Sequence, residues 1–205
     1  MTIHDHVISY TSEAQRLISH DFIKVTDLIG RDIPYTATLG KIINMLDTAD
    51  PNLMAYLIGN GGSAGIASEN ANRLNKYCGI KTMTFNDPIS MSASANDSLL
   101  GWPGVFAEIL KRYIKEDDLL IAISSSGSSE NIINAVDMAR QAKAVVITLS
   151  GFKSENPLRK LGDFNFYIPS SDYQLVEGSH SHILGLLVNT FVLVRQQKIN
   201  PKGLA

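Results

Sequence analysis

The sequence predicts an α/β fold in which a parallel sheet carries helices on both faces. Short apolar runs, typical of buried strands, alternate along the chain with longer polar stretches at helical spacing. Two of these runs end in loops rich in glycine and serine that lead directly into helical stretches. Right-handed crossovers bring such loops together at the carboxyl edge of a parallel sheet. We therefore expect any binding site at that edge.

The spacing of apolar residues predicts the elements in order. The first 50 residues have a helical pattern, broken at 30–34, and we expect no strand there. Strands are expected at 53–58, 81–85, 119–123, 144–149 and 164–168. Helices are expected at 64–77, 105–114, 131–142 and 175–196. Between them, Asn96 and Asp97 either lie near a site or cap a helix, and Trp102 lines either a ligand site or a subunit contact.

Length and composition limit the class of protein. The 205 residues suit one domain, with or without an appendage, and 44% of them are hydrophobic. The formal net charge of −2 gives no general attraction to nucleic acid or to an anionic membrane. A single cysteine, Cys78, excludes an internal disulfide and favours a reducing compartment. Without a leader-like start or a bilayer-spanning apolar run, we expect a cytoplasmic protein.

The loop after the strand at 119–123 has the composition of an anion site. Four hydroxyls surround the start of the next helix, whose first N–H groups have no partner within the helix; they belong to Ser124, Ser125, Ser126 and Ser129. The loop holds no lysine and lacks the P-loop spacing, which favours a sugar phosphate over a nucleoside triphosphate with magnesium. The alternative is a serine-rich turn in which Ser129 only caps the helix.

A second loop of the same kind follows the strand at 53–58. Glycines such as Gly61 allow close approach of the backbone to a ligand, and Ser63 either caps the next helix or binds an anion. The spacing is not that of a dinucleotide-binding loop.

The helix at 175–196 begins with a carboxylate and an imidazole on one face. Glu177 and His180 stand three residues apart, so their side chains are neighbours. Such a pair transfers protons or binds a metal, or else forms an ion pair at a helix end. The apolar middle of this helix, and the helical region before residue 50, suit burial against the core or a partner subunit.

Together these loops and Asn96-Asp97 resemble the SIS (sugar isomerase) family, and most closely its phosphoheptose isomerases, which act on sedoheptulose 7-phosphate. The resemblance implies a flavodoxin-like five-stranded parallel sheet over 51–205, preceded by a helical arm over 1–50. It also implies self-association as a homotetramer or homodimer. By the same resemblance the serines of both loops, with Gly61, would hold the phosphate, and Asn60 and Asp97 would lie near the sugar.

The chain departs from the family where the phosphoheptose isomerases bind zinc. Their zinc-binding His and catalytic Glu correspond here to Glu69 and Arg73, and a later Gln and His correspond to Glu177 and Gly185. The zinc and acid–base arrangement is therefore not intact, while His180 matches a further histidine of the family.

Two accounts follow from this departure. In the first, an isomerase uses Glu177, His180 and Glu69 for proton transfer, with Arg73 stabilising an enediolate. A divalent metal would then have Glu69, Glu177 and His180 as candidate ligands. In the second, the chain is a non-catalytic phosphosugar sensor or an assembly factor, such as one that binds a replication initiator. An isomerase would need the four catalytic candidates gathered beside the serine loop.

Overall fold

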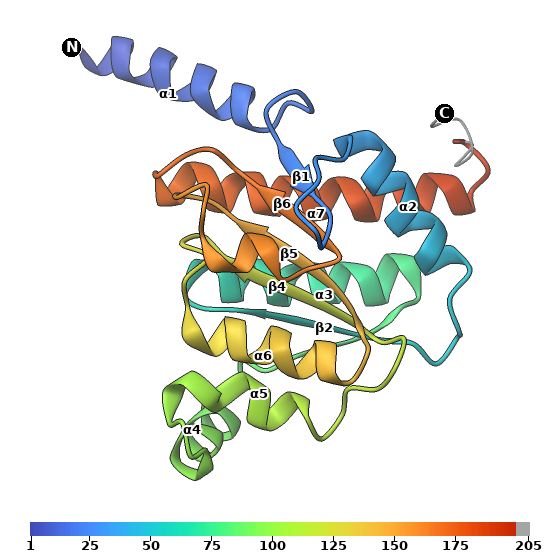
Figure 1. Ribbon diagram of the computed structural model, residues 1–205. Coiled ribbons are helices and arrows are strands. Elements are labelled where there is room, and N and C mark those ends of the chain that lie inside the picture. Colours follow the sequence, from blue (N-terminus) through green and yellow to red (C-terminus); the bar gives the residue numbers. More distant parts are fainter. Residues whose placement is uncertain (200–205) are drawn as a thin grey trace.

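A six-stranded sheet forms the centre of the protein, which we describe from a computed structural model over residues 1–199 (Figure 1). Its strands lie in the order β1-β6-β5-β4-β2-β3. The strands are β1 Lys24–Thr26, β2 Met54–Gly59, β3 Lys81–Thr84, β4 Leu119–Ser124, β5 Val145–Ser150 and β6 Phe164–Tyr167. The five strands from β2 onward are mutually parallel, with the strand order of flavodoxin-like folds. The predicted α/β class and its parallel sheet are confirmed.

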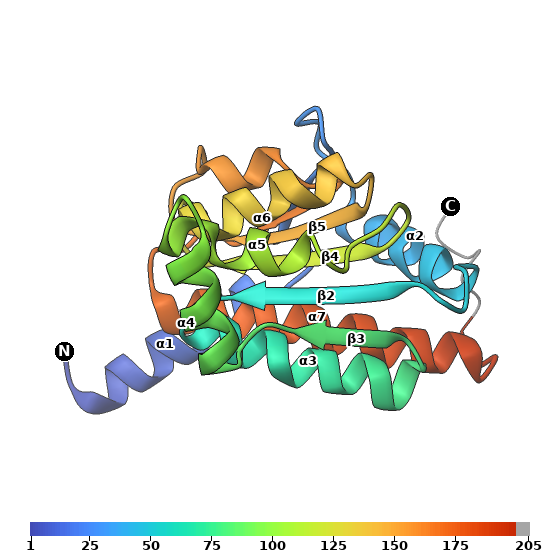
Figure 2. The same ribbon diagram turned by 90° about the horizontal axis from the view of Figure 1, so that it is seen from below.

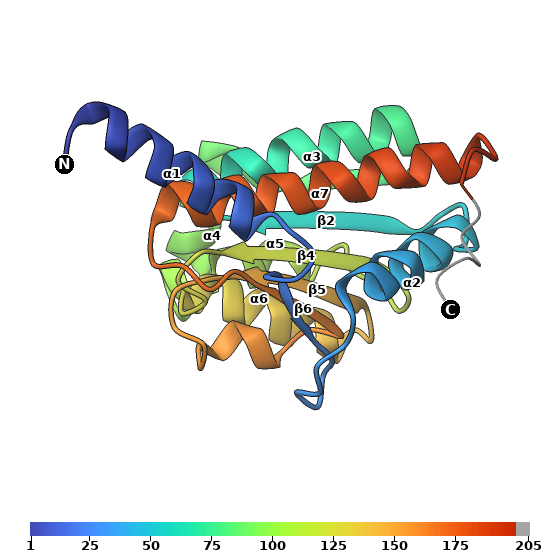
Figure 3. The same ribbon diagram turned by 90° about the horizontal axis from the view of Figure 1, so that it is seen from above.

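Helices cover both faces of the sheet, as Figures 2 and 3 show from opposite sides. On one face lie α2 Tyr35–Asp47, α3 Gly62–Cys78 and α7 Tyr173–Arg195, and on the other lie α5 Val105–Leu110 and α6 Glu130–Gln141. The strand β4 is buried along its whole length because it is central and covered on both sides. Odd-numbered β4 residues pack toward α3 and α7, and even-numbered ones toward α5 and α6. Among residues 1–199, no helix is both apolar and long enough to cross a bilayer.

The N-terminal region differs from the expectation of a purely helical arm. Helix α1 Ile3–Leu17 ends well before residue 29, and the strand β1 then pairs antiparallel with β6. The helical spacing of apolar residues predicted the wrong element because Val25 is buried by edge pairing with β6, a contact that local pattern does not reveal. Helix α2 belongs to the core, and only α1 projects from the body (Figure 1). The last six residues of the expected domain, 200–205, lie outside the described residues.

One further helix was not expected. Helix α4 Pro88–Asp97 begins at the N-cap Asp87, whose carboxylate accepts a hydrogen bond from the backbone N–H of Ser90 at 2.8 Å. No residue of α4 is buried, so its sequence has no apolar stripe to indicate a helix. Short 3₁₀ helices, Trp102–Gly104 (η1) and Pro157–Lys160 (η2), complete the described structure.

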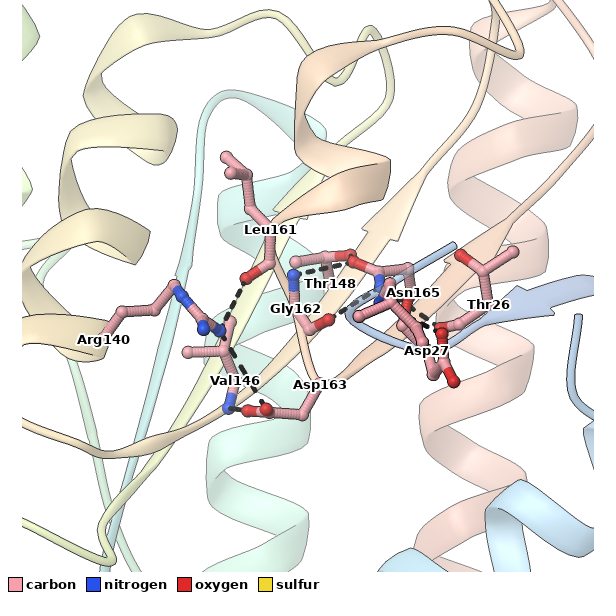
Figure 4. Close-up of polar contacts among 10 residues, drawn as sticks. Thr26, Asp27, Arg140, Val146, Thr148, Leu161, Gly162, Asp163 and Asn165 are labelled. Carbon is pink, nitrogen blue, oxygen red and sulfur yellow. Dashed lines mark hydrogen bonds and ion pairs between the residues drawn. The ribbon is translucent and has the colours of Figure 1, made fainter. Parts of the chain in front are cut away.

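A buried asparagine joins the edge strand to the rest of the sheet. Asn165 of β6 is fully buried, and its Oδ1 accepts hydrogen bonds from the hydroxyl of Thr148 and the N–H of Gly162, both at 2.8 Å (Figure 4). Its Nδ2 donates to the carbonyls of Gly162, Thr26 and Asp27 at 2.8 to 3.3 Å. This one side chain therefore links β5, β6 and the end of β1.

We expect Asn165→Ala to lower the free energy of unfolding by about 3 kcal/mol, because it leaves several buried polar groups without a partner. Thr148→Val is the matched control: it removes one member of the same network and should cost about 1 kcal/mol. Urea denaturation measures both. Equal costs for the two substitutions would contradict a central role for Asn165.

Candidate functional site

The two serine-ended loops lie side by side at the carboxyl edge of the sheet. In the register of β2 with β4, Gly59 is opposite Ile123, so the loop after each strand begins at the same level. In the next pair of strands, Ser124 is opposite Ser150. The parallel topology thus brings together loops that are more than 60 residues apart in the sequence, as the sequence predicts.

The helices that follow these loops begin without side-chain caps. Gly61 is the N-cap of α3 and Ser129 that of α6, and neither makes a capping hydrogen bond through a side chain. The hydroxyl of Ser129 instead accepts a hydrogen bond from that of Ser124 at 3.2 Å, so the reading in which Ser129 only caps the helix does not apply. Helix α7, in contrast, is capped by Asp172. The free N–H groups of α3 and α6 are therefore available to an anion.

These helix starts surround a cavity of about 270 Å³, which we call the serine pocket. Its lining residues are Asn60, Gly61, Gly62, Ser63, Ile123, Ser124, Ser125, Ser126, Ser129, Tyr173 and Glu177. Among residues 1–199, neither lysine nor arginine lines it, and Glu177 is its one charged lining residue. The hydroxyl of Ser125 is buried without a hydrogen-bond partner among the described residues, so it is free to bond a ligand. Seven of the eight predicted phosphate- and sugar-binding residues are thus gathered here.

A pair of amides joins the two loops. Asn60 and Asn131 each donate through Nδ2 to Oδ1 of the other, at 3.0 Å in both directions. Asn131 lies in the first turn of α6 and is almost fully buried. Its role was not predicted, because its partner stands 71 residues away and no local pattern marks the pair.

Two glycines leave room for a neighbouring side chain that a Cβ would displace. A Cβ on Gly62 would collide with the carboxylate of Glu177, so this glycine allows the carboxylate to rest against the first turn of α3. The positive end of the helix dipole favours a negative charge there. Gly127, in the serine loop, has a φ of 62°, and a Cβ on it would collide with the side chain of Asn156.

Four predicted site residues lie outside the serine pocket: Glu69, Arg73, Asp97 and His180. Glu69 and Arg73 form an ion pair at 2.5 Å on α3, one helical turn apart, and line none of the site. Asp97 ends α4, is exposed, and accepts a hydrogen bond from its neighbour Asn96. The four expected catalytic side chains therefore do not converge, and only Glu177 faces the loops.

His180 is fully buried next to the site rather than in it. Its Nε2 lies 3.1 Å from the carbonyl oxygen of Ser150, and its Nδ1 has no hydrogen-bond partner among the described residues. Burial lowers the pKa of His180 to about 4, because a charged imidazole would lose its hydration, while the bond to Ser150 opposes the shift. The folded protein therefore holds this imidazole neutral.

The residues present do not fit a zinc site. Within residues 1–199, no group of three or more His, Cys, Asp and Glu side chains is placed to hold a metal ion. The candidate ligands have three separate environments: Glu69 is paired with Arg73, Glu177 lines the serine pocket, and His180 is buried at the carbonyl of Ser150. Nη1 of Arg73 would lie 3.3 Å from a Cβ on Gly185, so positions 73 and 185 are neighbours.

A larger cleft of about 700 Å³ adjoins the serine pocket, and we call it the tryptophan cleft. Its lining residues are Gly59, Asn60, Gly61, Ala64, Gly65, Ser68, Asn86, Met91 and Trp102. Asn60 and Gly61 line both cavities. The sequence left two roles open for Trp102, and the structure places its side chain at this cleft.

Comparisons with known proteins agree with this architecture. The family model described as "SIS domain" matches residues 40–151. A phosphoheptose isomerase of Thermodesulfovibrio yellowstonii is 34% identical over 141 residues, which cover 64% of this chain and 69% of that protein. The solved phosphoheptose isomerase of Francisella tularensis aligns with a TM-score of 0.75 at 24% identity over 93% of this chain and 98% of that one. The structure of the NanR protein of Vibrio vulnificus, complexed with ManNAc-6P, aligns with a TM-score of 0.61 at 20% identity. The alignment covers 95% of this chain and 65% of that one.

We expect the burial of His180 to make stability depend on pH. Because the pKa of the imidazole is lower in the folded state than in the unfolded state, the unfolded chain takes up the extra proton as the pH falls. The free energy of unfolding should therefore decrease from pH 6.5 toward pH 4, by up to about 3 kcal/mol from this group. Urea denaturation across this range measures the effect, and His180→Gln should flatten the slope of the free energy of unfolding against pH.

The exposed neighbour His182 is the control: His182→Gln should leave this slope unchanged. Equal slopes in the wild type and His180→Gln would contradict the expectation.

Proposed function

The chain belongs to the SIS domain family, and on this premise we propose that it binds a sugar phosphate and interconverts its aldose and ketose forms. One observation carries the proposal: two uncapped helix starts and a cluster of serine hydroxyls surround a single pocket without any lysine or arginine. Such a site offers hydrogen-bond donors and the positive ends of two helix dipoles, which suit a phosphate monoester.

In the proposed complex the phosphate lies among the serines and the sugar extends toward Glu177. The phosphate oxygens accept hydrogen bonds from the first N–H groups of α6 and from hydroxyls such as that of Ser125. A NanR structure of the same fold holds the sugar phosphate ManNAc-6P, which supports this class of ligand. The relatives' name, phosphoheptose isomerase, supports a heptose phosphate as the substrate. Sedoheptulose 7-phosphate is the heptose phosphate that the family resemblance implies.

The convergence of four candidates that the sequence-based account required of an isomerase is not met, so the proposal assigns the proton transfer to Glu177 alone, the one candidate that lines the pocket. Its carboxylate removes a proton from the carbon next to the substrate carbonyl, and the C–H electron pair forms the carbon–carbon double bond of an enediol. The carbonyl π pair moves to its oxygen, which takes the proton of the neighbouring hydroxyl. The electron pair left on that neighbouring oxygen then forms the new C=O bond, and the C=C pair takes the proton back from Glu177 at the former carbonyl carbon. N–H groups at the start of α3 stabilise negative charge on the oxygens between these steps.

We propose no metal in this reaction, since the donor set does not fit one. Arg73 is paired with Glu69, lies near Gly185 and does not line the pocket. This gives Glu69 and Arg73 a structural role rather than the proton-transfer and enediolate-stabilising roles considered from the sequence.

Purified protein should convert sedoheptulose 7-phosphate to an aldose phosphate, and Glu177→Gln should slow this conversion by at least about 100-fold by removing the base. The same substitution should preserve the thermal stabilisation that the ligand provides. The control is Glu69→Gln, a carboxylate on α3 that lies outside the pocket; it should retain most of the activity. A chelator should leave the wild-type rate unchanged.

Each failure has a distinct meaning. Stabilisation by sugar phosphates without conversion of any of them would overturn the isomerase and support a non-catalytic sensor or assembly factor. No stabilisation by any sugar phosphate would overturn the phosphate site itself. Loss of activity with a chelator, restored by zinc, would show that residues from another subunit complete a metal site.

Self-association is a further part of the proposal. Helix α1 carries one apolar stripe that is buried at Leu17 but exposed at Ile3 and Val7, where the helix leaves the body (Figure 1). A second copy of the chain would cover this stripe.

We expect light scattering after gel filtration to give the mass of a dimer or tetramer. Val7→Asp should reduce that mass, whereas Gln15→Asp, on the same helix and outside the stripe, should not. A monomeric wild type would contradict the proposal.

A further inference from the structure

The tyrosine that begins α7 lines the serine pocket together with Glu177, and the proton transfer at carbon leaves it without a role. We propose that the phenol of Tyr173 carries the proton between the two oxygens of the substrate while Glu177 acts at the carbon. This inference rests on the proposed function, because it assumes that a sugar phosphate is isomerised in this pocket. It adds a second catalytic residue, which an aromatic partner holds in place.

Tyr173 and Glu177 stand four residues apart on α7, so their side chains share one face of the helix. Such neighbours have Cβ atoms about 5–6 Å apart, which lets one small ligand contact both. Tyr173 is 58% exposed and lines a cavity of about 270 Å³, so its ring is accessible to a ligand. The pocket therefore offers a carboxylate and a phenol to the same part of the substrate.

A strained residue packs against the ring of Tyr173. Phe152, two residues beyond β5, has a φ of 58°, in the left-handed region that bulky side chains rarely adopt. Its N–H donates to the carbonyl of Ser170 at 2.8 Å, and its carbonyl accepts a hydrogen bond from the hydroxyl of Tyr167 at 2.9 Å. Its ring meets that of Tyr173 edge to face, with 4.7 Å between the centroids and 80° between the planes. Strain of this kind persists where the surrounding structure enforces it and is concentrated at functional sites.

Isomerisation needs a group that both gives and takes a proton at oxygen. Glu177 holds the proton from carbon during that step, so it cannot serve the oxygens at the same time. The amide of Asn60 donates hydrogen bonds without releasing a proton, and the serine hydroxyls are assigned to the phosphate. Tyrosine is among the side chains that act as general acids and bases, and a phenol releases its proton more readily than an aliphatic hydroxyl. Among the described residues, Tyr173 is the one lining residue besides Glu177 with this chemistry.

The proposed relay returns the phenol to its starting state. Oη of Tyr173 donates its proton to the carbonyl oxygen as the carbonyl π pair moves onto that oxygen. Oη then takes the proton of the neighbouring hydroxyl, whose electron pair stays on its own oxygen and forms the new C=O bond. The relay consumes no co-reactant. It replaces a direct transfer between adjacent oxygens, in which the O–H···O angle would be far from the straight arrangement that hydrogen bonds prefer.

Tyr173→Phe keeps the ring against Phe152 and removes only the hydroxyl. With sedoheptulose 7-phosphate it should lower kcat by about 100-fold, because it removes a general acid–base group. The KM, and the thermal stabilisation that the ligand provides, should stay nearly unchanged. The matched control is Tyr77→Phe, which removes the hydroxyl of an exposed tyrosine in the last turn of α3 and should retain the wild-type rate.

Phe152→Leu tests the aromatic partner as a positioning residue. It keeps an apolar side chain and removes the ring edge, so it should lower kcat by about tenfold through a misplaced phenol. Because Phe152 acts only through the Tyr173 hydroxyl, combining Phe152→Leu with Tyr173→Phe should give a kcat no lower than that of Tyr173→Phe alone. A merely structural effect of Phe152→Leu would instead add to the loss.

Each contrary outcome has a separate meaning. A wild-type kcat in Tyr173→Phe, together with a slow Glu177→Gln, would overturn the relay and leave the proposed function standing. A raised KM with an unchanged kcat would show that Tyr173 only binds the sugar, which also overturns the relay. Additive losses in the double variant would overturn the positioning role of Phe152. If the wild type converts no sugar phosphate, the proposed function and this inference fail together.

Discussion

The reciprocal amide pair between Asn60 and Asn131 fixes the distance between the two helix starts that form the site. Each asparagine belongs to a different strand–loop–helix unit, and the pair closes directly across the edge of the sheet. A phosphate held between two helix starts needs both sets of N–H groups at once, so any change in their separation weakens the site. Because the pair forms within the protein, the geometry exists before the ligand arrives, and binding need not supply that ordering.

The sequence was most informative where chemistry and topology coincide. The serine loop could be located because a run of buried residues, a cluster of hydroxyls and a helix follow one another without interruption, and parallel topology fixes where that loop lies. The role of Asn131 could not be predicted because it depends on a hydrogen-bonded contact with Asn60, which is distant in the sequence. The strand β1 was missed for the same kind of reason, since its pairing with β6 defines it more than its own three residues do. Helix α4 lacked the apolar stripe on which a helical prediction depends.

The catalytic candidates illustrate a different limit. Their correspondence to the family's zinc-binding and catalytic positions suggested that Glu69 and Arg73 act on a ligand. Two side chains one helical turn apart can equally neutralise each other, and the structure shows this second arrangement. His180 stood beside Glu177 in the pattern, yet burial and the carbonyl of Ser150 separate its role from that of the carboxylate. Spacing identifies neighbours on a helix, whereas packing against other elements decides which of them faces a cavity.

Helix α7 is long enough to connect Glu177, in the serine pocket, with contacts at the opposite end of the molecule. Glu177 is near the start of this 23-residue helix, and Arg195, at its last residue, pairs with Asp47 of α2. The two positions are 18 residues apart, so the helix acts as a rigid rod of about 27 Å between them. A slide of that rod along α3 would move the carboxylate away from Gly62 by the same amount. The position of Glu177 therefore depends on contacts made along the whole length of α7, including the remote pair of Arg195 with Asp47.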